Sequence, residues 1–301
     1  MRILSIGELL WDVIGDQEYL GGAPLNFSVS SQRLGSDVAF VSAIGADQRG
    51  ALAIQLIQAL GLSPRFIQIV PGCDTGAAFV TTDEFGSATF QIKRPAAFDF
   101  LNIQESMLSD FADMRPDWIY FGTLAQTDPR NETILHRLVA RVPEAGCFYD
   151  MNLREGHWSL DLVQRLSRLA SIIKLNESEA ETLFRLTRSL ERFSLEEFCR
   201  YWSSTYNIET ICITLGGAGC AVFINGTLRT YPGYTIKVVD TVGAGDAFAA
   251  AFLHGLHLGW PVERIAPFAN SLGALVASRA GATPAWTIDE CLEFTGSPLN
   301  N

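Results

Sequence analysis

The sequence is poor in basic residues. Its 301 residues include 22 lysines and arginines against 33 aspartates and glutamates, which gives a formal net charge of -11 at pH 7. Proteins that bind nucleic acid or anionic membranes present a basic face, so we expect neither partner. Local backbone donors and a metal ion would have to hold any phosphorylated substrate, because bulk positive charge is lacking.

Long apolar runs and closely spaced cysteine pairs are also missing. No segment approaches the roughly 20 apolar residues of a membrane span, and the apolar stretch after Met1 reaches Glu8 too soon for a signal peptide. The six cysteines show no CxxC spacing, which predicts reduced core thiols and a cytoplasmic location. With 48% apolar and 18% charged residues, the chain can build the core of one large α/β domain.

What the chain does have is a glycine-rich turn late in the sequence. Residues 235–239 are predicted to form a β-branched strand and residues 247–258 a helix, with Gly243, Gly245 and Asp246 between them. Glycines let a ligand approach the backbone, and the first turn of a helix presents unpaired N–H groups that bind phosphate. A phosphate would repel Asp246, so we predict a specific role for it: accepting the proton of an attacking hydroxyl.

The glycine turn also has other interpretations. An aspartate at the start of a helix is often only a capping residue, and this alternative stays open for Asp246. Two other phosphate-binding motifs are excluded. No Lys-Ser/Thr pair follows the glycines, as a P-loop requires, and Phe248 stands where a dinucleotide-binding fingerprint has its third glycine or alanine.

The run DTVGAGD at residues 240–246 resembles the C-terminal signature of the ribokinase-like (pfkB) family of sugar and nucleoside kinases. The resemblance implies that Gly243, Ala244 and Gly245 form the anion hole for the transferred phosphate and that Asp246 is the catalytic base. It also implies the fold, a doubly wound, mostly parallel sheet with helices on both faces and a small β-sheet lid. We expect one domain over residues 1–301.

Residues near the N-terminus match the same family's sugar-binding motifs. Asp12 lies in an apolar stretch, where a carboxylate is costly to bury unless it is paired or bound to ligand hydroxyls. Gly21 and Gly22 open a helix whose first turn contains Asn26, which can both donate and accept hydrogen bonds. Taken singly, Asp12 is more often a turn residue and Asn26 more often a cap. The resemblance implies that these four residues bind the substrate.

A hairpin interrupts the alternation of strands and helices. Residues 75–92 alternate in β fashion on either side of a turn at 83–86. In the family such strands, together with a short piece near residues 13–20, form a lid over the sugar (here about 13–20 and 75–93) and often a homodimer contact. An ordinary antiparallel sheet edge is the alternative. Arg94 follows the hairpin in an Arg-Pro run similar to fructokinases, which implies a sugar contact; a surface arginine is the other interpretation.

Polar residues also follow the later strands of the predicted sheet. Ligands of parallel sheets gather at the carboxyl ends of the strands, where Asp150 and Asn152 follow a predicted strand at 147–150. Together with Arg154 they match the Asp-x-Asn-x-Arg run of fructokinases and close relatives, which implies that Asp150 and Asn152 bind substrate. Met151 departs from the proline that many relatives have and leaves the polar set intact.

The remaining motifs imply a nucleotide site. Asn176 and Glu179 match the family's Asn-x-x-Glu, where Glu179 meets Mg²⁺ through water, although the same spacing is a helix capping box. The resemblance assigns further contacts to ATP and assigns backbone carbonyls to a monovalent cation such as K⁺. The predicted ATP contacts are Thr214, Gly216, Gly219 and Asn270, and the predicted cation ligands are Asp240, Val242 and Gly281.

The sequence therefore predicts an ATP-dependent kinase that phosphorylates a hydroxymethyl group of a monosaccharide. Fructose is the predicted sugar, and 2-dehydro-3-deoxygluconate and ribose are the alternatives. A non-catalytic, sugar-sensing relative would be expected to lose Asp246 or the glycines beside it, and this chain keeps them.

Overall fold

The chain folds around two β-sheets of different size. The structure, a computed structural model, describes residues 1–82, 88–188 and 192–295. Within them the larger sheet has nine strands in the order β13-β12-β11-β10-β9-β8-β1-β4-β5, and the smaller has four in the order β3-β2-β6-β7. The larger sheet consists of β1 (Arg2–Ile6), β4 (Asp37–Gly45), β5 (Ile67–Val70), β8 (Trp118–Gly122), β9 (Gly146–Asp150), β10 (Ile172–Asn176), β11 (Thr210–Thr214), β12 (Gly219–Ile224) and β13 (Thr227–Pro232).

Most strands of the larger sheet are parallel. The strands from β5 to β11 pair in parallel, and β12 and β13 add an antiparallel end. The β12–β13 turn passes through Asn225 and Gly226, with φ angles of 51° and 77°. Two left-handed residues define the type I′ turn that the Asn-Gly pair predicts. Buried strands such as β1, which is exposed only at Arg2, need cover on both faces.

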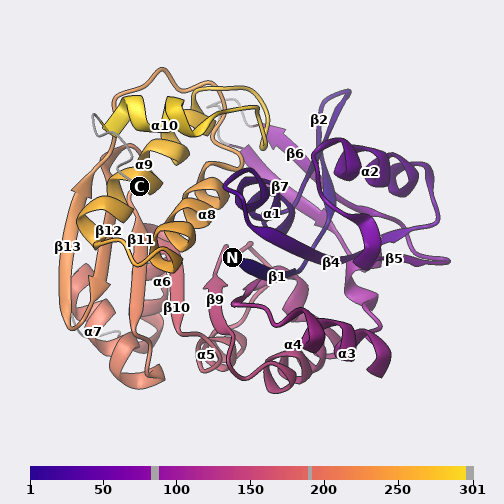
Figure 1. The fold of residues 1–301 in the computed structure, drawn as a ribbon, viewed down its shortest axis with the longest axis horizontal. Helices are drawn as coiled ribbons and strands as arrows, with labels where there is room; N and C mark the ends of the chain where they lie inside the picture. Colours follow the sequence, from indigo (N-terminus) through magenta and orange to yellow (C-terminus); the bar gives the residue numbers. More distant parts are fainter. Residues whose placement is uncertain (83–87, 189–191, 296–301) are drawn as a thin grey trace.

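Helices supply that cover on both faces (Figure 1). One face packs on helices α1, α2, α8 and α9, with Phe27 and Phe252 fully buried in its core. The other face packs on α3 to α7, where Phe198 and Trp202 stack one helical turn apart. The helices are α1 (Ala23–Arg33), α2 (Gln48–Ala59), α3 (Glu105–Met114), α4 (Pro129–Arg141), α5 (Leu160–Ser167), α6 (Glu177–Thr187), α7 (Leu195–Tyr206), α8 (Ala244–His257), α9 (Val262–Ala277) and α10 (Ile288–Thr295). The predicted fold class is confirmed.

The smaller sheet stands apart from the larger one, in the upper right of Figure 1. It contains β2 (Leu10–Ile14), β3 (Gln17–Gly21), β6 (Gly76–Thr82) and β7 (Ala88–Lys93). Strand β2 pairs with β3 and β7 pairs with β6 in antiparallel fashion, while β2 and β6 run parallel. The turn predicted at 83–86 lies outside the described residues. Two distant segments therefore meet in one small sheet.

The prediction of a strand at residues 235–239 is wrong. This segment belongs to neither sheet, and the side chains of Val238 and Val239 are 58% and 55% exposed. Among the described residues the large sheet ends at β13, and this segment does not extend it. Its backbone instead bonds to a helix end, since Val239 N donates to Ala277 O at 2.9 Å. A β-branched composition indicates a strand only where a partner strand is available.

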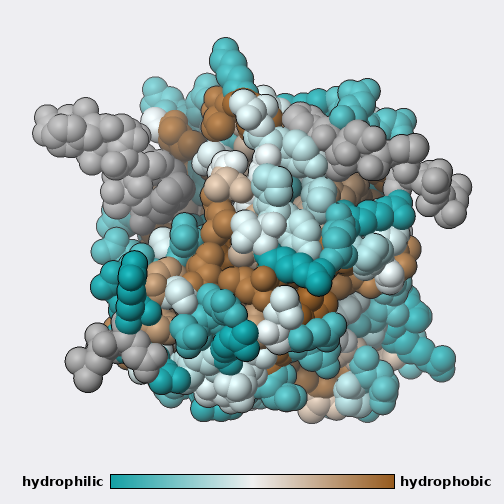
Figure 2. Space-filling model, turned by 90° about the vertical axis from the view of Figure 1, so that its left-hand side faces the viewer, coloured by the Kyte–Doolittle hydropathy of each residue, from teal (hydrophilic) through white to brown (hydrophobic). Residues whose placement is uncertain are grey.

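The β13 edge of the large sheet is polar. Strand β13 exposes Thr227 and Arg229 and ends at Pro232, features that discourage pairing with another chain. Figure 2 shows the side of the molecule on which β13 lies: hydrophilic residues cover most of it, and a narrow hydrophobic strip runs between them. Within residues 1–82, 88–188 and 192–295, the helices are all too short or too polar to cross a membrane.

Candidate active site

The glycine turn before α8 is built so that only glycine fits at its first position. Gly243 has a φ angle of 79°, and a Cβ atom there would lie 2.1 Å from Ala282 O. At Gly245 a Cβ atom would lie 3.1 Å from Lys174 Nζ. The turn leads into α8, and Asp246 lies in the first turn of that helix. The predicted helix is confirmed and begins three residues earlier than expected, at Ala244.

Asp246 is a buried carboxylate with one side-chain hydrogen bond, from Asn26 Nδ2 to Oδ2 at 2.9 Å. Its side chain is 7% exposed. Burial and the neighbouring Asp150 raise the pKa of Asp246 from 3.8 to about 6, although Lys174, Asn26 and Arg154 oppose the shift. A carboxylate with a pKa close to the working pH is suited to accept a proton during a reaction.

A cavity of about 270 Å³ opens in front of Asp246. It collects Asp12, Gly22, Asn26, Asn152, Gly243, Gly245 and Asp246, all of which are predicted site residues. The small sheet forms its outer wall through Leu10 and Asp12 of β2, Ala78 of β6 and Ile92 of β7. Polar groups from four separate parts of the chain thus converge on one space.

The glycine pair before α1 allows the chain to approach Glu8 and Asp12 closely. Gly22 has a φ angle of 111°, and a Cβ atom on it would lie 2.5 Å from Glu8 O. A Cβ atom on Gly21 would lie 2.5 Å from Asp12 Oδ2. Gly21 does not itself line the cavity, but its lack of a side chain leaves room for the Asp12 carboxylate. Burial raises the pKa of Asp12 from 3.8 to about 6, against the opposing charge of Arg154.

Three buried polar atoms on the cavity residues lack a hydrogen-bond partner among the described residues. They are Oε2 of Glu8, Oδ1 of Asn26 and Nδ2 of Asn152. Leaving a buried polar atom unpaired costs about 1–3 kcal/mol, so such atoms are rare unless a ligand or water completes them. Two acceptors and one donor around one cavity match a ligand with several hydroxyl groups, because each hydroxyl both donates and accepts.

Sequence reasoning missed Glu8 as a site residue. It lies two residues after β1, at the carboxyl end of a central parallel strand, which is the criterion that singled out Asp150. Glu8 is 5% exposed, and burial raises its pKa from 4.5 to about 7, opposed by backbone N–H groups and Arg154. Arg154, cited only as part of a motif, also lines the cavity and is the single cationic residue among those lining it.

Asp150 lies beneath the cavity and does not line it. Its carboxylate is fully buried and forms an ion pair of 2.9 Å with Lys174 Nζ, and Tyr120 OH donates to it at 2.9 Å. The structure therefore does not bring Asp150 to the predicted sugar contacts. Lys174 escaped sequence reasoning because a lysine inside a buried strand carries no recognisable motif.

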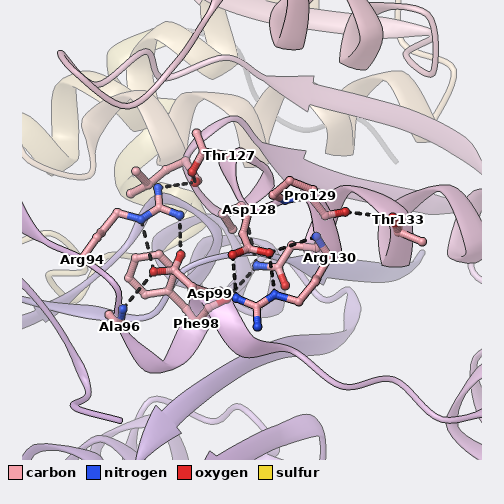
Figure 3. Close-up of polar contacts among 12 residues, drawn as sticks. Arg94, Ala96, Phe98, Asp99, Thr127, Asp128, Pro129, Arg130 and Thr133 are labelled. Carbon is pink, nitrogen blue, oxygen red and sulfur yellow. Dashed lines mark hydrogen bonds and ion pairs between the residues drawn. The ribbon is translucent and has the colours of Figure 1, made fainter.

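Arg94 likewise does not line the Asp246 cavity, and Figure 3 shows its guanidinium against Asp99. Its guanidinium pairs with Asp99, and Nη1 donates to Leu124 O at 3.0 Å. It lines a neighbouring cavity of about 530 Å³ together with Gln126 and Asp128. Because Leu124 lines the Asp246 cavity, Arg94 is linked to that cavity through one backbone contact.

A cavity of about 290 Å³, the second cavity of the site, meets the Asp246 cavity at the glycine turn. Thr241 and Gly245 line both cavities, and Ala244 lines the second. The predicted nucleotide residues Thr214, Gly216, Gly219 and Asn270 all line this second cavity. Its remaining wall is largely apolar and includes Ile236, Phe248, Ala274 and Ala277. A flat, partly apolar group fits such a wall, with anionic groups at the helix N-terminus.

Asn176 and Glu179 form the capping box that the sequence allowed. Asn176 Oδ1 accepts from Glu179 N at 2.9 Å, and Glu179 Oε2 accepts from Asn176 N at 2.8 Å. Glu179 Oε1 accepts from Leu153 N at 2.7 Å. Neither residue lines the two cavities. Each carboxylate oxygen keeps a second lone pair, which can accept a hydrogen bond from a water molecule on a metal ion.

The predicted cation loop is held together by Asp240. Its Oδ1 accepts from Val242 N at 3.0 Å and its Oδ2 from Gly281 N at 3.1 Å. All three predicted residues are thus neighbours. Among the described residues, no group of three or more His, Cys, Asp or Glu side chains is arranged to hold a metal ion.

Comparison with known proteins agrees with this arrangement. The family model described as pfkB family carbohydrate kinase matches residues 3–289. Fructokinase-1 of Oryza sativa subsp. japonica is 29% identical over 278 residues, which cover 88% of this chain and 84% of the relative. A fructokinase of Vibrio alginolyticus is 27% identical over 316 residues, covering 98% and 99%.

Solved structures resemble the fold over nearly its whole length. A fructokinase from Xylella fastidiosa with bound ATP superposes with a TM-score of 0.86 at 22% identity, covering 98% of each chain. A fructokinase from Vibrio cholerae O395, in a form with bound fructose, ADP and calcium ion, gives a TM-score of 0.83 at 27% identity, covering 97% of this chain and 98% of that one.

Proposed function

Because the chain belongs to the pfkB family of carbohydrate kinases and is an ATP-dependent sugar kinase, we propose that it phosphorylates a hydroxymethyl group of fructose. The observation that carries the proposal is the set of unpartnered atoms on Glu8, Asn26 and Asn152, in the cavity that Asp246 faces. A sugar would complete these hydrogen bonds and present one hydroxyl to Asp246.

The charges in the cavity support a neutral sugar. Glu8, Asp12 and Asp246 are three carboxyl groups, and Arg154 is the one cationic residue that lines the cavity with them. An acidic sugar such as 2-dehydro-3-deoxygluconate would add a fourth carboxylate to this space. Like charges that share a site disfavour each other's ionised forms, so a neutral ligand fits this set better. The fructokinase names of the similar proteins point the same way.

The proposed reaction takes place where the two cavities meet. Asp246 accepts the proton of the sugar hydroxyl, and the backbone N–H groups around Gly243, Ala244 and Gly245 stabilise charge on the transferred phosphoryl group. The nucleotide occupies the second cavity, against Thr214, Gly216, Gly219 and Asn270. Mg²⁺ bound to the nucleotide would neutralise phosphate charge, with Glu179 ordering its water and Asn176 fixing Glu179. The loop around Asp240, Val242 and Gly281 is the proposed place for K⁺.

The small sheet is the proposed lid and dimer contact. Strand register puts Ile14 and Tyr19 on the same face as Asp12, and both are more than 40% exposed. This face extends past the cavity, so a second copy of the chain could cover its apolar residues while the lid excludes water from the reaction. The six free cysteines, five of them buried, suit the reducing cytoplasm in which we expect the enzyme to work.

An ADP-release assay with a panel of sugars tests the proposal. We expect kcat/KM to be highest for fructose, with ribose and 2-dehydro-3-deoxygluconate at least tenfold lower. A higher value for either competitor would replace fructose as the substrate. Absence of turnover with every sugar and ATP would favour the sugar-sensing alternative.

A further inference from the structure

A buried ion pair in the large sheet lies next to the glycine turn. Lys174 in β10 is 4% exposed, and its Nζ contacts both carboxylate oxygens of Asp150 at 2.9 and 3.1 Å. Tyr120 OH, also fully buried, donates to Asp150 Oδ2 at 2.9 Å. Three adjacent strands, β8, β9 and β10, therefore supply one member each to this Lys174–Asp150–Tyr120 network.

The ammonium group of Lys174 reaches the catalytic turn from below. Its Nζ lies 3.1 Å from the place where a Cβ atom on Gly245 would stand, so any larger residue at 245 would press on it. Burial alone would lower the pKa of Lys174, but Asp150 and Asp246 outweigh burial and raise it. Lys174 is therefore cationic at neutral pH, and its charge acts on Asp246.

Two physical costs oppose a charged lysine at this position. The N-terminus of a helix carries partial positive charge, and a cation there is repelled. Burying an ion pair also removes two charges from water, and apolar residues of similar volume are often as stable or more so. Asp150 and Asp246 offset these costs for the charged lysine. A fixed cation next to the first turn of α8 also suits an anion that binds on the other side of the turn.

We infer that Lys174 is a positioning residue of the kinase site: held by Asp150 and Tyr120, it supplies a fixed positive charge beneath Gly245 that favours both ionised Asp246 and the phosphoryl group in transfer. The inference rests on the proposed function, since it concerns the same turn. Lys174 does not line either cavity and so acts through the turn without touching the sugar. Charges and hydrogen-bond donors that are oriented toward the developing charge before the reaction starts are usually the largest contribution to catalysis.

Several charged groups face Asp246 and must be considered together. Lys174 and Arg154 favour its ionised form, and Asp150 disfavours it. Glu8 and Asp12 are in the same cavity and are themselves affected by the Asp246 charge. Lys174 and Asp150 are the pair that can be changed without altering the cavity walls, because neither lines them.

The test breaks this ion pair from each side. For K174M we expect kcat to fall at least tenfold, with KM for the sugar within threefold, and the acid limb of the kcat/KM profile to move to higher pH. D150N keeps the lysine charge, so its kcat should exceed that of K174M by at least tenfold, and its acid limb should move to lower pH. Both variants lose the same contact, and their melting temperatures are measured alongside.

Unequal kcat values and opposite shifts of the acid limb support the inference. Equal losses of kcat in the two variants, or shifts in the same direction, would mean that the pair only holds the fold together. If K174M does not fold, the K174M/D150N variant, which buries no unpaired charge, replaces it. Wild-type-like kcat in that variant would overturn the inference. All assays use the sugar that the wild-type enzyme phosphorylates best, so a failure of the fructose proposal is recognised separately in the wild-type panel.

Discussion

Asn26 in α1 donates a hydrogen bond of 2.9 Å to Asp246 in α8, although the two residues are 220 positions apart in the chain. The bond joins a predicted sugar contact to the predicted base. It leaves Asn26 Oδ1 unpartnered among the described residues and available to a ligand. One amide thus fixes the orientation of the carboxylate and can also contact the substrate.

Replacing Asn26 by alanine should raise the pKa of Asp246, because the hydrogen bond from Asn26 is one of the contacts that lower it. The acid limb of the kcat/KM profile should then move to higher pH. At neutral pH, kcat/KM should fall about tenfold or more, since a hydrogen bond to a charged group contributes about 1.5–3 kcal/mol. S28A is the control: Ser28 lies in the same helix but donates to Pro24 O. An unshifted acid limb in N26A would contradict the prediction.

Asp246→Asn should remove the base while keeping the size of the side chain. General bases contribute about a hundredfold or more, so we expect kcat to fall by at least that factor while KM for the sugar changes little. Steady-state kinetics with the preferred sugar measure both. D128N, which alters the cap of α4 and the ion pair with Arg130 and does not touch the Asp246 cavity, is the control. Gly243 is the N-cap of α8 and no side chain caps this helix, so a loss below about tenfold in D246N would mean that Asp246 is not the base.

Local sequence patterns predicted much of this site because the structures that they indicate are formed by residues close together in the chain. The glycine turn and the capping box of Asn176 and Glu179 both depend on neighbouring residues. The sequence did not predict features that depend on pairing across the fold. Asp150 was expected at the sugar because its partner Lys174, 24 residues away, cannot be inferred from local pattern.

The prediction of a strand at 235–239 was wrong for the same reason. Its β-branched residues are typical of a strand, but the sheet already ends at β13, which no local pattern reveals. Arg94 was expected at the sugar for a related reason. The proximity of Asp99 and of Leu124 O to its guanidinium is a property of the folded chain.

Glu8 should make the stability of the protein depend on pH. Its pKa is raised from 4.5 to about 7 in the folded state, so the folded state holds a proton that the unfolded state releases. The associated stabilisation is fully present below pH 4.5 and is lost as the pH rises to about 7. By linkage it is on the order of 3 kcal/mol at most. Urea unfolding of wild type and E8Q at pH 5, 6, 7 and 8 measures it.

The E8Q variant should therefore gain stability relative to wild type as the pH rises from 5 to 8, because glutamine cannot ionise. The control E196Q alters an exposed carboxylate on α7 that pairs with Arg200. It should show no comparable trend over this range. A constant difference between E8Q and wild type at all four pH values would mean that Glu8 is ionised throughout.

Arg94 and Arg130 provide a matched comparison, because each pairs with an aspartate in the region drawn in Figure 3. The Arg94 side chain is 14% exposed and that of Asp99 3%, so R94A would leave a buried carboxylate unpaired and should cost about 3–5 kcal/mol of stability. It also removes one of the two donors to Leu124 O, the other being Thr127 Oγ1. KM for the sugar should rise more than kcat falls, because Leu124 lines the Asp246 cavity. R130A removes an exposed arginine and should change neither property appreciably. Equal effects of the two variants on unfolding and on KM would show that Arg94 does not support the cavity.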